Sequence, residues 1–216
     1  RDRVSVCLNT SGQGLNRRGY RAAGVAAPIR ETLAAGLVML TGWKGSEFAD
    51  PMCGSGTIAI EAAMLGANIA PGLARAFDAQ HWHTFNRAFV DEKKTASCQM
   101  TQCPPVFASD IDKKALSLAS QNAKAAGVDI NLYHADVKDF SRKDCTVLIN
   151  PPYAVRLGEK DAVHALYGDM GRALSGVEKK HIITADEQFE RYFGKRASKK
   201  RKLYNGNIRC TLFQYT

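Results

Sequence analysis

The stretch Glu47-Phe-Ala-Asp-Pro-Met-Cys-Gly-Ser-Gly-Thr57 joins a short strand to a helix through a tight loop that contains two glycines. Gly54 and Gly56 let the backbone approach a ligand closely, and the first turn of the following helix offers free N–H groups. The spacing differs from G-x-G-x-x-G and from the P-loop, because no third glycine and no lysine follow. A ligand-binding loop and a simple strand-to-helix turn are therefore equally good interpretations of this stretch.

The same alternation of strand and helix continues along the chain. Short apolar runs predict strands at residues 106–110, 130–134, 145–149 and 181–185. Good helix formers predict helices at residues 28–40, 57–65, 113–126, 161–174 and 187–193. Pro28 opens the first of these helices, and Gly127 closes the third. The alternation predicts a doubly wound α/β sheet, in which ligands bind at the carboxyl ends of the strands.

Two further segments predict hairpins at the ends of the chain. Residues 4–9 alternate like a strand, and the basic segment 17–21 is interpreted as a loop or as the returning strand. Residues 202–206 and 208–215 predict a second hairpin, with Asn205-Gly206 as its turn. This second hairpin is expected to add one antiparallel strand at the far edge of the sheet.

The net charge of +9 is concentrated at the two ends of the 216-residue chain. Residues 1–30 carry a net +5, residues 31–190 carry −4 and residues 191–216 carry +8. Basic ends around a mildly acidic body favour a polyanionic partner, because Lys and Arg bind such a partner with release of counterions. For the basic run at 199–202, a solvated segment without a partner is an equally good interpretation.

Length and composition limit the class of protein further. A chain of this size with 45% hydrophobic residues suits one full domain. No apolar run reaches the roughly 18 residues of a membrane helix, so no membrane partner is expected. The six cysteines are scattered, and neither Cys98 with Cys103 nor His81 with His83 makes a convincing zinc pattern. We expect no metal, and scattered cysteines in apolar strands indicate a reducing cytoplasm.

Acidic residues follow the second and third predicted core strands. Asp110 lies next to the glycine loop, where a carboxylate can hydrogen-bond both hydroxyls of a ribose. Asp112 suits the N-cap of the helix that begins at residue 113. Asp136 can accept a hydrogen bond from an adenine amino group, although by itself a turn or capping role explains it better.

Asn150-Pro-Pro-Tyr153 directly follows a continuous apolar strand. The two prolines fix the backbone and remove two N–H donors, so the carbonyls of the segment are expected to be free to point at a substrate. The Asn150 side chain adds an acceptor, and Tyr153 adds a flat face for stacking. Acceptors that converge on an amino nitrogen hold its hydrogens and aim its lone pair at an electrophile. A neutral nitrogen can attack a sulfonium methyl group and lose its proton afterwards, so no general base is needed first.

In four motifs that occur in the same order, the chain resembles the class I S-adenosylmethionine-dependent amino-methyltransferases. These motifs are Asp50-Pro-x-Cys-Gly-Ser-Gly-Thr57, Ser109-Asp-Ile-Asp112, Ala135-Asp136 and Asn150-Pro-Pro-Tyr153. Other segments resemble RNA methylases that carry an N-terminal THUMP domain: Arg18-Gly-Tyr-Arg21, Ala27-Pro-Ile-Arg-Glu-Thr-Leu33, Asn68-Ile-Ala-Pro-Gly72 and Lys202-Leu-Tyr-Asn-Gly206. Within that group the chain looks most like the bacterial 23S rRNA guanine-N2 methyltransferases. The resemblance covers essentially the whole chain.

The resemblance implies a Rossmann-like, seven-stranded, mostly parallel sheet with its last strand antiparallel, and S-adenosylmethionine as the cofactor. It implies that Asp110 binds the ribose, that Asp136 contacts the adenine, and that Arg30, Glu31 and Thr32 lie beside the methionine end. The other implied cofactor residues are Asp50, Met52, Cys53, Gly54, Gly56, Thr57, Ile111, Val137 and Asn150. The implied catalytic residues, which hold and stack a target base swung out of its stack, are Asn150, Pro151, Pro152 and Tyr153.

The activity implied by the resemblance is methyl transfer to an exocyclic amino group of a base in RNA, with guanine N2 of 23S rRNA as the first choice. Adenine-N6 methylation of DNA or RNA, glutamine-N5 methylation of a protein, and non-catalytic RNA binding stay open as alternatives. RNA is expected to contact the basic ends at Arg17, Arg18, Arg21, Lys195, Lys199, Lys200, Arg201 and Lys202. The aromatic residues Phe77, Trp82, Phe85 and Phe89 line either the path of RNA or, as helical spacing more often indicates, a packing face.

Two departures from the family pattern are visible. Ala154-Val155 stands where the family commonly has Gly-Glu, ahead of Arg156-Leu-Gly158, and this change bears on how the target loop closes. No THUMP domain is present and the sequence starts at Arg1, so an upstream domain is expected in the full-length protein. Residues 1–45 are expected to form an N-terminal hairpin and a helix that pack on a methyltransferase domain of residues 46–216, in a cytoplasmic protein.

Overall fold

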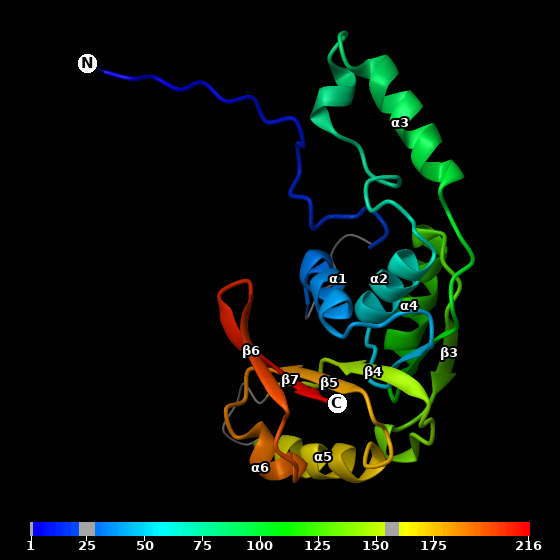
Figure 1. Ribbon diagram of the computed structural model, residues 1–216, viewed down its shortest axis with the longest axis vertical. Coiled ribbons are helices and arrows are strands. Elements are labelled where there is room, and N and C mark those ends of the chain that lie inside the picture. The colour runs from blue at the N-terminus through cyan, green and yellow to red at the C-terminus, as the bar shows by residue number, and fades with distance from the viewer. Residues whose placement is uncertain (1, 22–28, 154–159) are drawn as a thin grey trace.

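The computed structural model describes residues 2–21, 29–153 and 160–216. Its centre is a seven-stranded sheet with the strand order β3-β2-β1-β4-β5-β7-β6 (Figure 1). The strands are β1 (Glu47–Asp50), β2 (Val106–Asp110), β3 (Asn131–His134), β4 (Cys145–Ile149), β5 (Lys180–Thr184), β6 (Lys199–Asn205) and β7 (Ile208–Tyr215). The predicted α/β architecture and the implied number of strands are therefore confirmed.

The direction of winding reverses at β1. This strand pairs in parallel with β2 on one side and with β4 on the other. In open α/β sheets, the crevice at the carboxyl ends of two such strands is where ligands bind. The glycine loop follows β1 and Asn150 follows β4, so the fold brings the two most informative segments of the sequence to the same crevice.

The C-terminal hairpin is present, but its strands are arranged differently from the prediction. β7 is antiparallel to both β5 and β6, which confirms the implied antiparallel last strand. Its predicted place at the edge is wrong, because β6 occupies the edge and β7 lies inside. The side chains explain this order: β7 buries Leu212, Phe213 and Tyr215, whereas the lysine-rich β6 is mostly exposed. Lysines on an edge strand also discourage pairing with other chains.

Helices cover both faces of the sheet (Figure 1). The long helices are α1 (Glu31–Leu40), α2 (Thr57–Gly66), α4 (Lys113–Ala126) and α5 (Lys160–Ala173), and α6 is short (Phe189–Phe193). Adjacent residues of a strand point to opposite faces, so Leu148 joins the core beneath α1 and α2, and Ile149 joins the core that contains Tyr167 of α5 and Phe189 of α6. The expectation that β4 is buried on both faces is confirmed.

The strand predicted at residues 4–9 is wrong. The described N-terminal residues form no strand, and the side chains of Val4, Val6 and Leu8 are 86%, 86% and 74% exposed. An alternating segment forms a stable strand only when a neighbouring strand pairs with its backbone and its apolar face is packed. The exposed apolar side chains of this segment show that its apolar face is not packed. The predicted N-terminal hairpin is therefore absent from residues 2–21. The following helix is confirmed from Glu31 onward, and Pro28 lies outside the described residues.

Three shorter or more remote elements complete the described chain: η1 (Asp78–His81), α3 (Asn86–Cys98) and η2 (Val137–Asp139). The helix α3 buries none of its residues. Phe77 and Phe89 contact each other with ring centroids 5.6 Å apart, which is a local pair and not a face on the main core. Among the described residues, no helix is both long and apolar enough to cross a membrane.

Candidate functional site

The loop after β1 is held in a shape that only small residues allow. Gly56 has φ of +84°, and a Cβ at this position would lie 3.0 Å from the Cβ of Ala119 on α4. The Cys53 N–H donates to the Ser109 carbonyl oxygen at 2.9 Å, which ties the loop to β2. A substitution at Gly56 would strain the backbone and press on α4. The loop therefore places the amino end of α2 directly over the crevice.

Asp50 is a buried carboxyl group with an unused acceptor. Its side chain is 1% exposed, and Oδ1 has no hydrogen-bond partner. Burial, opposed by the Met52 backbone N–H and aided by the nearby Asp110, raises the pKa of Asp50 to about 8. The group is thus mostly protonated at neutral pH. A buried oxygen atom without a hydrogen-bond partner, next to the glycine loop, fits a site in which a polar ligand supplies the missing donor.

We expect Asp50→Asn to change how stability depends on pH. The folded pKa of about 8 lies above the reference value of 3.8, so the carboxyl group's contribution is complete below pH 4 and is lost as pH rises through 8. The asparagine variant lacks this loss. Its unfolding free energy relative to wild type should rise by up to about 1.4 kcal/mol per pH unit between pH 5 and 8. Urea unfolding across this range measures the difference, and exposed Asp139→Asn serves as the control for the loss of a carboxyl group at the surface.

Asp110 and Asp112 differ in the hydrogen bonds that their carboxyl groups accept. The Oδ2 atom of Asp110 accepts from the Gly54 N–H at 2.8 Å, and its Oδ1 accepts from the Asp112 N–H at 2.9 Å. The side chain of Asp112 accepts from the Lys114 N–H, which confirms it as the N-cap of α4. Asp110 therefore connects the glycine loop to the end of β2, at the position expected for a ribose contact.

Asp136 combines a capping role with a place at the cavity. Its Oδ1 accepts from the Lys138 N–H at 3.0 Å and caps η2, as the alternative interpretation held. Lys138 Nζ lies 3.9 Å from Asp136 Oδ2 and 3.2 Å from Asp169 Oδ2, so it bridges η2 and α5. A carboxylate accepts more than one hydrogen bond. Capping therefore does not exclude a second contact from Asp136 to a ligand.

A cavity of about 480 Å³ brings several of the predicted cofactor residues together. Met52, Asp110, Ile111, Asp136, Val137 and Pro152 line it. The sequence did not identify its remaining wall, which α5 contributes through Ala162, Ala165, Leu166 and Asp169. The apolar spacing of α5 indicates a buried helix face, but not which cavity that face borders. Volume and lining suit a small molecule with an apolar body and a few polar groups.

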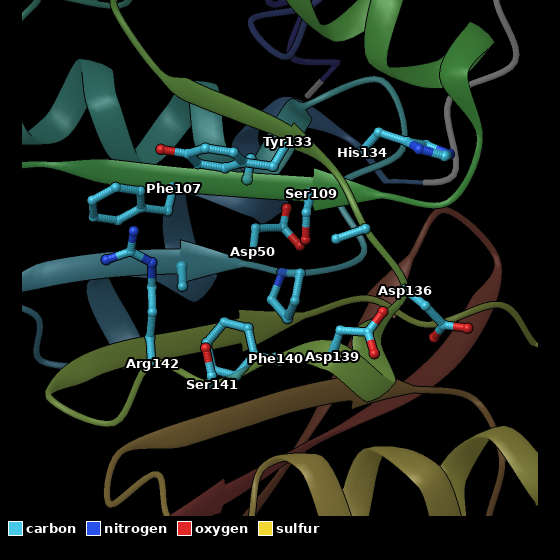
Figure 2. A pocket seen from close by; sticks show the side chains of 14 residues that line it. Asp50, Phe107, Ser109, Tyr133, His134, Asp136, Asp139, Phe140, Ser141 and Arg142 are labelled. Atoms are coloured by element: carbon cyan, nitrogen blue, oxygen red, sulfur yellow. The ribbon is translucent and has the colours of Figure 1, made fainter.

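A second hollow of about 330 Å³ adjoins this cavity and shares Pro51, Ala135 and Asp136 with it. Figure 2 shows the carboxyl group of Asp50 beside Ser109 near the middle, with Phe107, Arg142 and the Tyr133 ring to the left and Asp136 to the right. The Arg142 guanidinium lies 3.4 Å from the centroid of the Phe107 ring and 2.9 Å from Glu47 Oε2. Between β3 and β4 the chain forms only η2, so no long helix covers this part of the sheet.

The Asn150–Tyr153 segment follows β4 and is held by hydrogen bonds that involve two tyrosine hydroxyl groups. Tyr167 Oη donates to the Pro152 carbonyl oxygen at 3.4 Å and lies 3.2 Å from Thr184 Oγ1. The prediction that all carbonyls of this segment are free is therefore wrong for Pro152. Tyr153 Oη donates to Asn150 Oδ1, and burial raises the pKa of Tyr153, which keeps its hydroxyl a donor. A substrate amino group that binds Asn150 has to displace this hydrogen bond.

On the other side of Tyr153 lies a polar cavity of about 310 Å³. It is lined by Tyr153, Lys160, His164, Ala185, Asp186, Glu187 and Gln188. His164 Nε2 lies 3.1 Å from Asp186 Oδ2, and the His164 ring stacks on Tyr192 with centroids 3.7 Å apart. The residues that follow the tetrapeptide, 154–159, lie outside the described residues, and with them Ala154-Val155 and Arg156-Leu-Gly158.

The basic side chains near the N-terminus differ in their exposure and in whether they form ion pairs. Arg18 Nε lies 3.4 Å from Glu61 Oε1, and Arg21 Nη1 lies 3.6 Å from Glu31 Oε1. Both arginine side chains are less than 15% exposed, whereas Arg17 is exposed. Because partly buried ion pairs neutralise Arg18 and Arg21, they present little free charge to a phosphate. The Arg21–Glu31 pair instead fixes the start of α1 against α2, where Arg21 Nη2 also donates to Thr57 Oγ1 at 2.5 Å.

The remaining predicted residues lie around the hairpin. Arg30 and Thr32 are exposed, and Arg30 Nη2 would lie 3.6 Å from a Cβ at Gly206. Lys195, Lys199, Lys200, Arg201 and Lys202 are all exposed. Lys200 pairs with Glu190 and lies 5.5 Å from the centroid of the Phe213 ring. In the described part of the chain, no three His, Cys, Asp or Glu side chains gather into a possible metal site.

The sheet order, the antiparallel β7 and the glycine loop at the switch point define a class I, Rossmann-like methyltransferase fold. A sequence family described as "RMKL-like, methyltransferase domain" matches residues 18–214. The chain belongs to this family.

Relatives support the same assignment. "Putative RNA methyltransferase YpsC" of Bacillus subtilis (strain 168) is 43% identical across 100% of this chain, which spans 58% of that protein. "Ribosomal RNA large subunit methyltransferase K/L" of Syntrophotalea carbinolica is 36% identical across 100% of this chain, which spans 33% of that protein. The solved structure of SMU.472, described as a putative methyltransferase complexed with SAH, is 37% identical and superposes with a TM-score of 0.88. That match covers 95% of this chain and 56% of the other.

Proposed function

We propose that this chain binds S-adenosylmethionine and transfers its methyl group to an exocyclic amino nitrogen of a base in RNA. The observation that carries the proposal is that Pro152 lines the same cavity as Asp110 and Asp136. Asn150 is two residues before Pro152 in the segment that reaches the cavity with the expected ribose and adenine partners. The SAH complex of SMU.472 supports the choice of cofactor, because SAH is the product left when S-adenosylmethionine loses its methyl group.

The residues of the chain position the two reactants. The bound cofactor supplies a methyl group on a sulfonium centre, which an amino nitrogen can attack directly. Asn150 Oδ1 accepts one amino hydrogen of the target base and so turns the nitrogen lone pair toward the cavity. Tyr153 releases Asn150 as the base enters, and its ring then stacks on the base. Tyr167 keeps the turn rigid by holding the Pro152 carbonyl group.

Charge favours RNA over protein as the substrate. Exposed cations gather along β6, and carboxylates are few there. A glutamine-methylating enzyme has little need of such a surface, whereas RNA binding depends on it.

Incubation of the chain with labelled S-adenosylmethionine and, separately, rRNA, DNA or a release factor tests the choice of substrate. Label in RNA alone is expected, and label in DNA or protein alone would overturn the proposal. Failure to bind S-adenosylmethionine in calorimetry would instead favour a non-catalytic RNA-binding role.

Within RNA, we propose guanine N2 of 23S rRNA as the target. The relative named for the large ribosomal subunit supports large-subunit rRNA as the substrate, and guanine N2 is the atom that we propose within it. Mass spectrometry of digested rRNA, from cells with and without the gene, identifies the modified nucleoside that disappears. Loss of N2-methylguanosine is expected, and loss of N6-methyladenosine would point to adenine. We further propose that the protein is cytoplasmic and that it carries an upstream THUMP domain. The proposed further domain agrees with the greater length of the relatives, of which this chain spans 58% and 33%.

The exposed cations of β6 are expected to set the salt dependence of RNA binding. Single-stranded RNA contacts contribute about 0.7 to the slope of log K against log salt for each phosphate neutralised. Replacing Lys199, Arg201 and Lys202 with glutamine should therefore weaken binding and reduce this slope by up to about 2. Fluorescence anisotropy at several salt concentrations measures both quantities.

A control for this charge change uses three lysines that lie outside β6. Lys124, Lys143 and Lys179 are exposed and lie near the amino ends of the sheet strands. Replacing these three with glutamine alters the net charge equally. If both triple variants lose an equal amount of the slope of log K against log salt, RNA binding depends on total charge and not on the cations of β6.

A further inference from the structure

Tyr204 is a large aromatic side chain that the fold leaves in solvent. It lies on the edge strand β6 and is 65% exposed. It has no role in either hydrophobic core, whereas the preceding Leu203 packs against the core beneath α1. An exposed tyrosine contributes little to folding, and its ring is open to stack on a partner with a flat face.

Cations flank Tyr204 on the same face of the hairpin. Directly paired residues of neighbouring strands share a face, and the register pairs Tyr204 with Arg209 and Lys202 with Thr211. Lys202 is two residues from Tyr204 on β6, so it shares that face too. Arg209 is 54% exposed and Lys202 is exposed as well. The face therefore places two cationic side chains beside one aromatic ring: Lys202 along the strand, and Arg209 across the hairpin in a solvent-exposed ion pair with Glu187.

This face continues into the catalytic region. Arg209 Nη2 lies 3.0 Å from Glu187 Oε1, and Glu187 lines the polar cavity that also contains Tyr153. Tyr153 in turn contacts Asn150 through its hydroxyl group. The chain of contacts from Asn150 through Tyr153, the cavity and Glu187 ends at Arg209 and Tyr204. A strand of RNA whose target base reaches Asn150 would thus leave the cavity at this face.

We propose that Tyr204, Lys202 and Arg209 form a subsite for one unpaired nucleotide next to the target base. The base of that nucleotide stacks on the Tyr204 ring, and its phosphates lie against Lys202 and Arg209. The proposal rests on the proposed RNA substrate and adds to it a requirement for an unpaired neighbour. Stacking suits this role because every base has a flat face, so the subsite holds the strand without reading its sequence.

Tyr204→Ala in the present chain tests the subsite. Removing one stacked aromatic ring typically weakens single-strand binding about 5- to 150-fold. We expect such a loss for an unpaired RNA oligonucleotide that contains the target sequence, with SAH affinity unchanged in calorimetry. Tyr204→Phe keeps the ring and should bind within about twofold of wild type. If Phe fails like Ala, or if Ala binds like wild type, stacking on Tyr204 is excluded.

Tyr133 provides a matched control at the opposite edge of the sheet. It is 49% exposed and stacks against Phe107, far in strand order from β6. Tyr133→Ala removes a ring of the same kind and should leave RNA affinity unchanged. If wild-type chain methylates RNA but Tyr204→Ala and Tyr133→Ala bind it equally well, the subsite is wrong and the proposed function stands. If wild-type chain methylates DNA or protein and not RNA, the proposed function itself fails.

Discussion

Asn150→Ala should reduce the rate of methyl transfer by at least about 1,000-fold while SAH binds within about threefold of its wild-type affinity. The Asn150 side chain is the acceptor that orients the target amino group, and loss of one such oriented contact costs about 100- to 1,000-fold in rate. Loss of alignment between nitrogen and methyl group adds to this cost. Single-turnover assays with labelled S-adenosylmethionine measure the rate, and calorimetry with SAH measures the cofactor site separately.

Tyr153→Phe is the informative companion to this variant. It keeps the ring that stacks on the base but removes the hydroxyl group that donates to Asn150 Oδ1. The substrate then has no hydrogen bond to displace, although the turn loses one contact. We expect the rate to change less than tenfold, in contrast to the loss in Asn150→Ala. If Asn150→Ala retains the wild-type rate, the amide does not hold the target and the mechanism is wrong.

Local sequence patterns predicted the parts of the fold that depend on neighbours in the chain. The glycine loop after β1 is such a case, because Gly56 is required by its own backbone angle and by close approach of α4. The Asp112 cap is another, since the carboxyl group binds a backbone N–H only two residues away. Patterns of this kind depend on interactions between residues that are close in the chain, so a single sequence is enough to identify them.

Contacts between distant segments could not be predicted in the same way. Arg18 looked like a free phosphate ligand, but it pairs with Glu61, which is 43 residues away in the chain. The strand predicted at residues 4–9 failed for a related reason: alternation says which side chains share a face, not whether a partner edge exists. The wall that α5 adds to the cavity likewise follows from how the helix crosses the sheet.

Asp110→Ala should weaken SAH binding by at least about 100-fold, whereas Asp112→Ala should leave it within about twofold. Two charge-assisted hydrogen bonds to ribose hydroxyls contribute about 1.5–3 kcal/mol each, and both disappear with the Asp110 carboxylate. Asp112 only caps α4, so its removal should cost about 0.5–2 kcal/mol of folding stability and spare the cofactor. Calorimetry with SAH and urea unfolding separate the two effects, and equal loss of affinity in both variants would contradict the assignment.

A loss of affinity in Asp110→Ala has two possible causes, because Asp110 also accepts hydrogen bonds from the Gly54 and Asp112 N–H groups. A cofactor analogue without the ribose 2′-hydroxyl distinguishes them. If Asp110 binds that hydroxyl, wild type should bind the analogue more weakly than SAH, while the alanine variant should bind both with nearly equal affinity. If Asp110 only orders the glycine loop, the variant should lose as much affinity on removal of the hydroxyl as wild type does. The double comparison therefore tests ribose recognition itself, because a disordered loop lowers the affinities for SAH and for the analogue by the same factor.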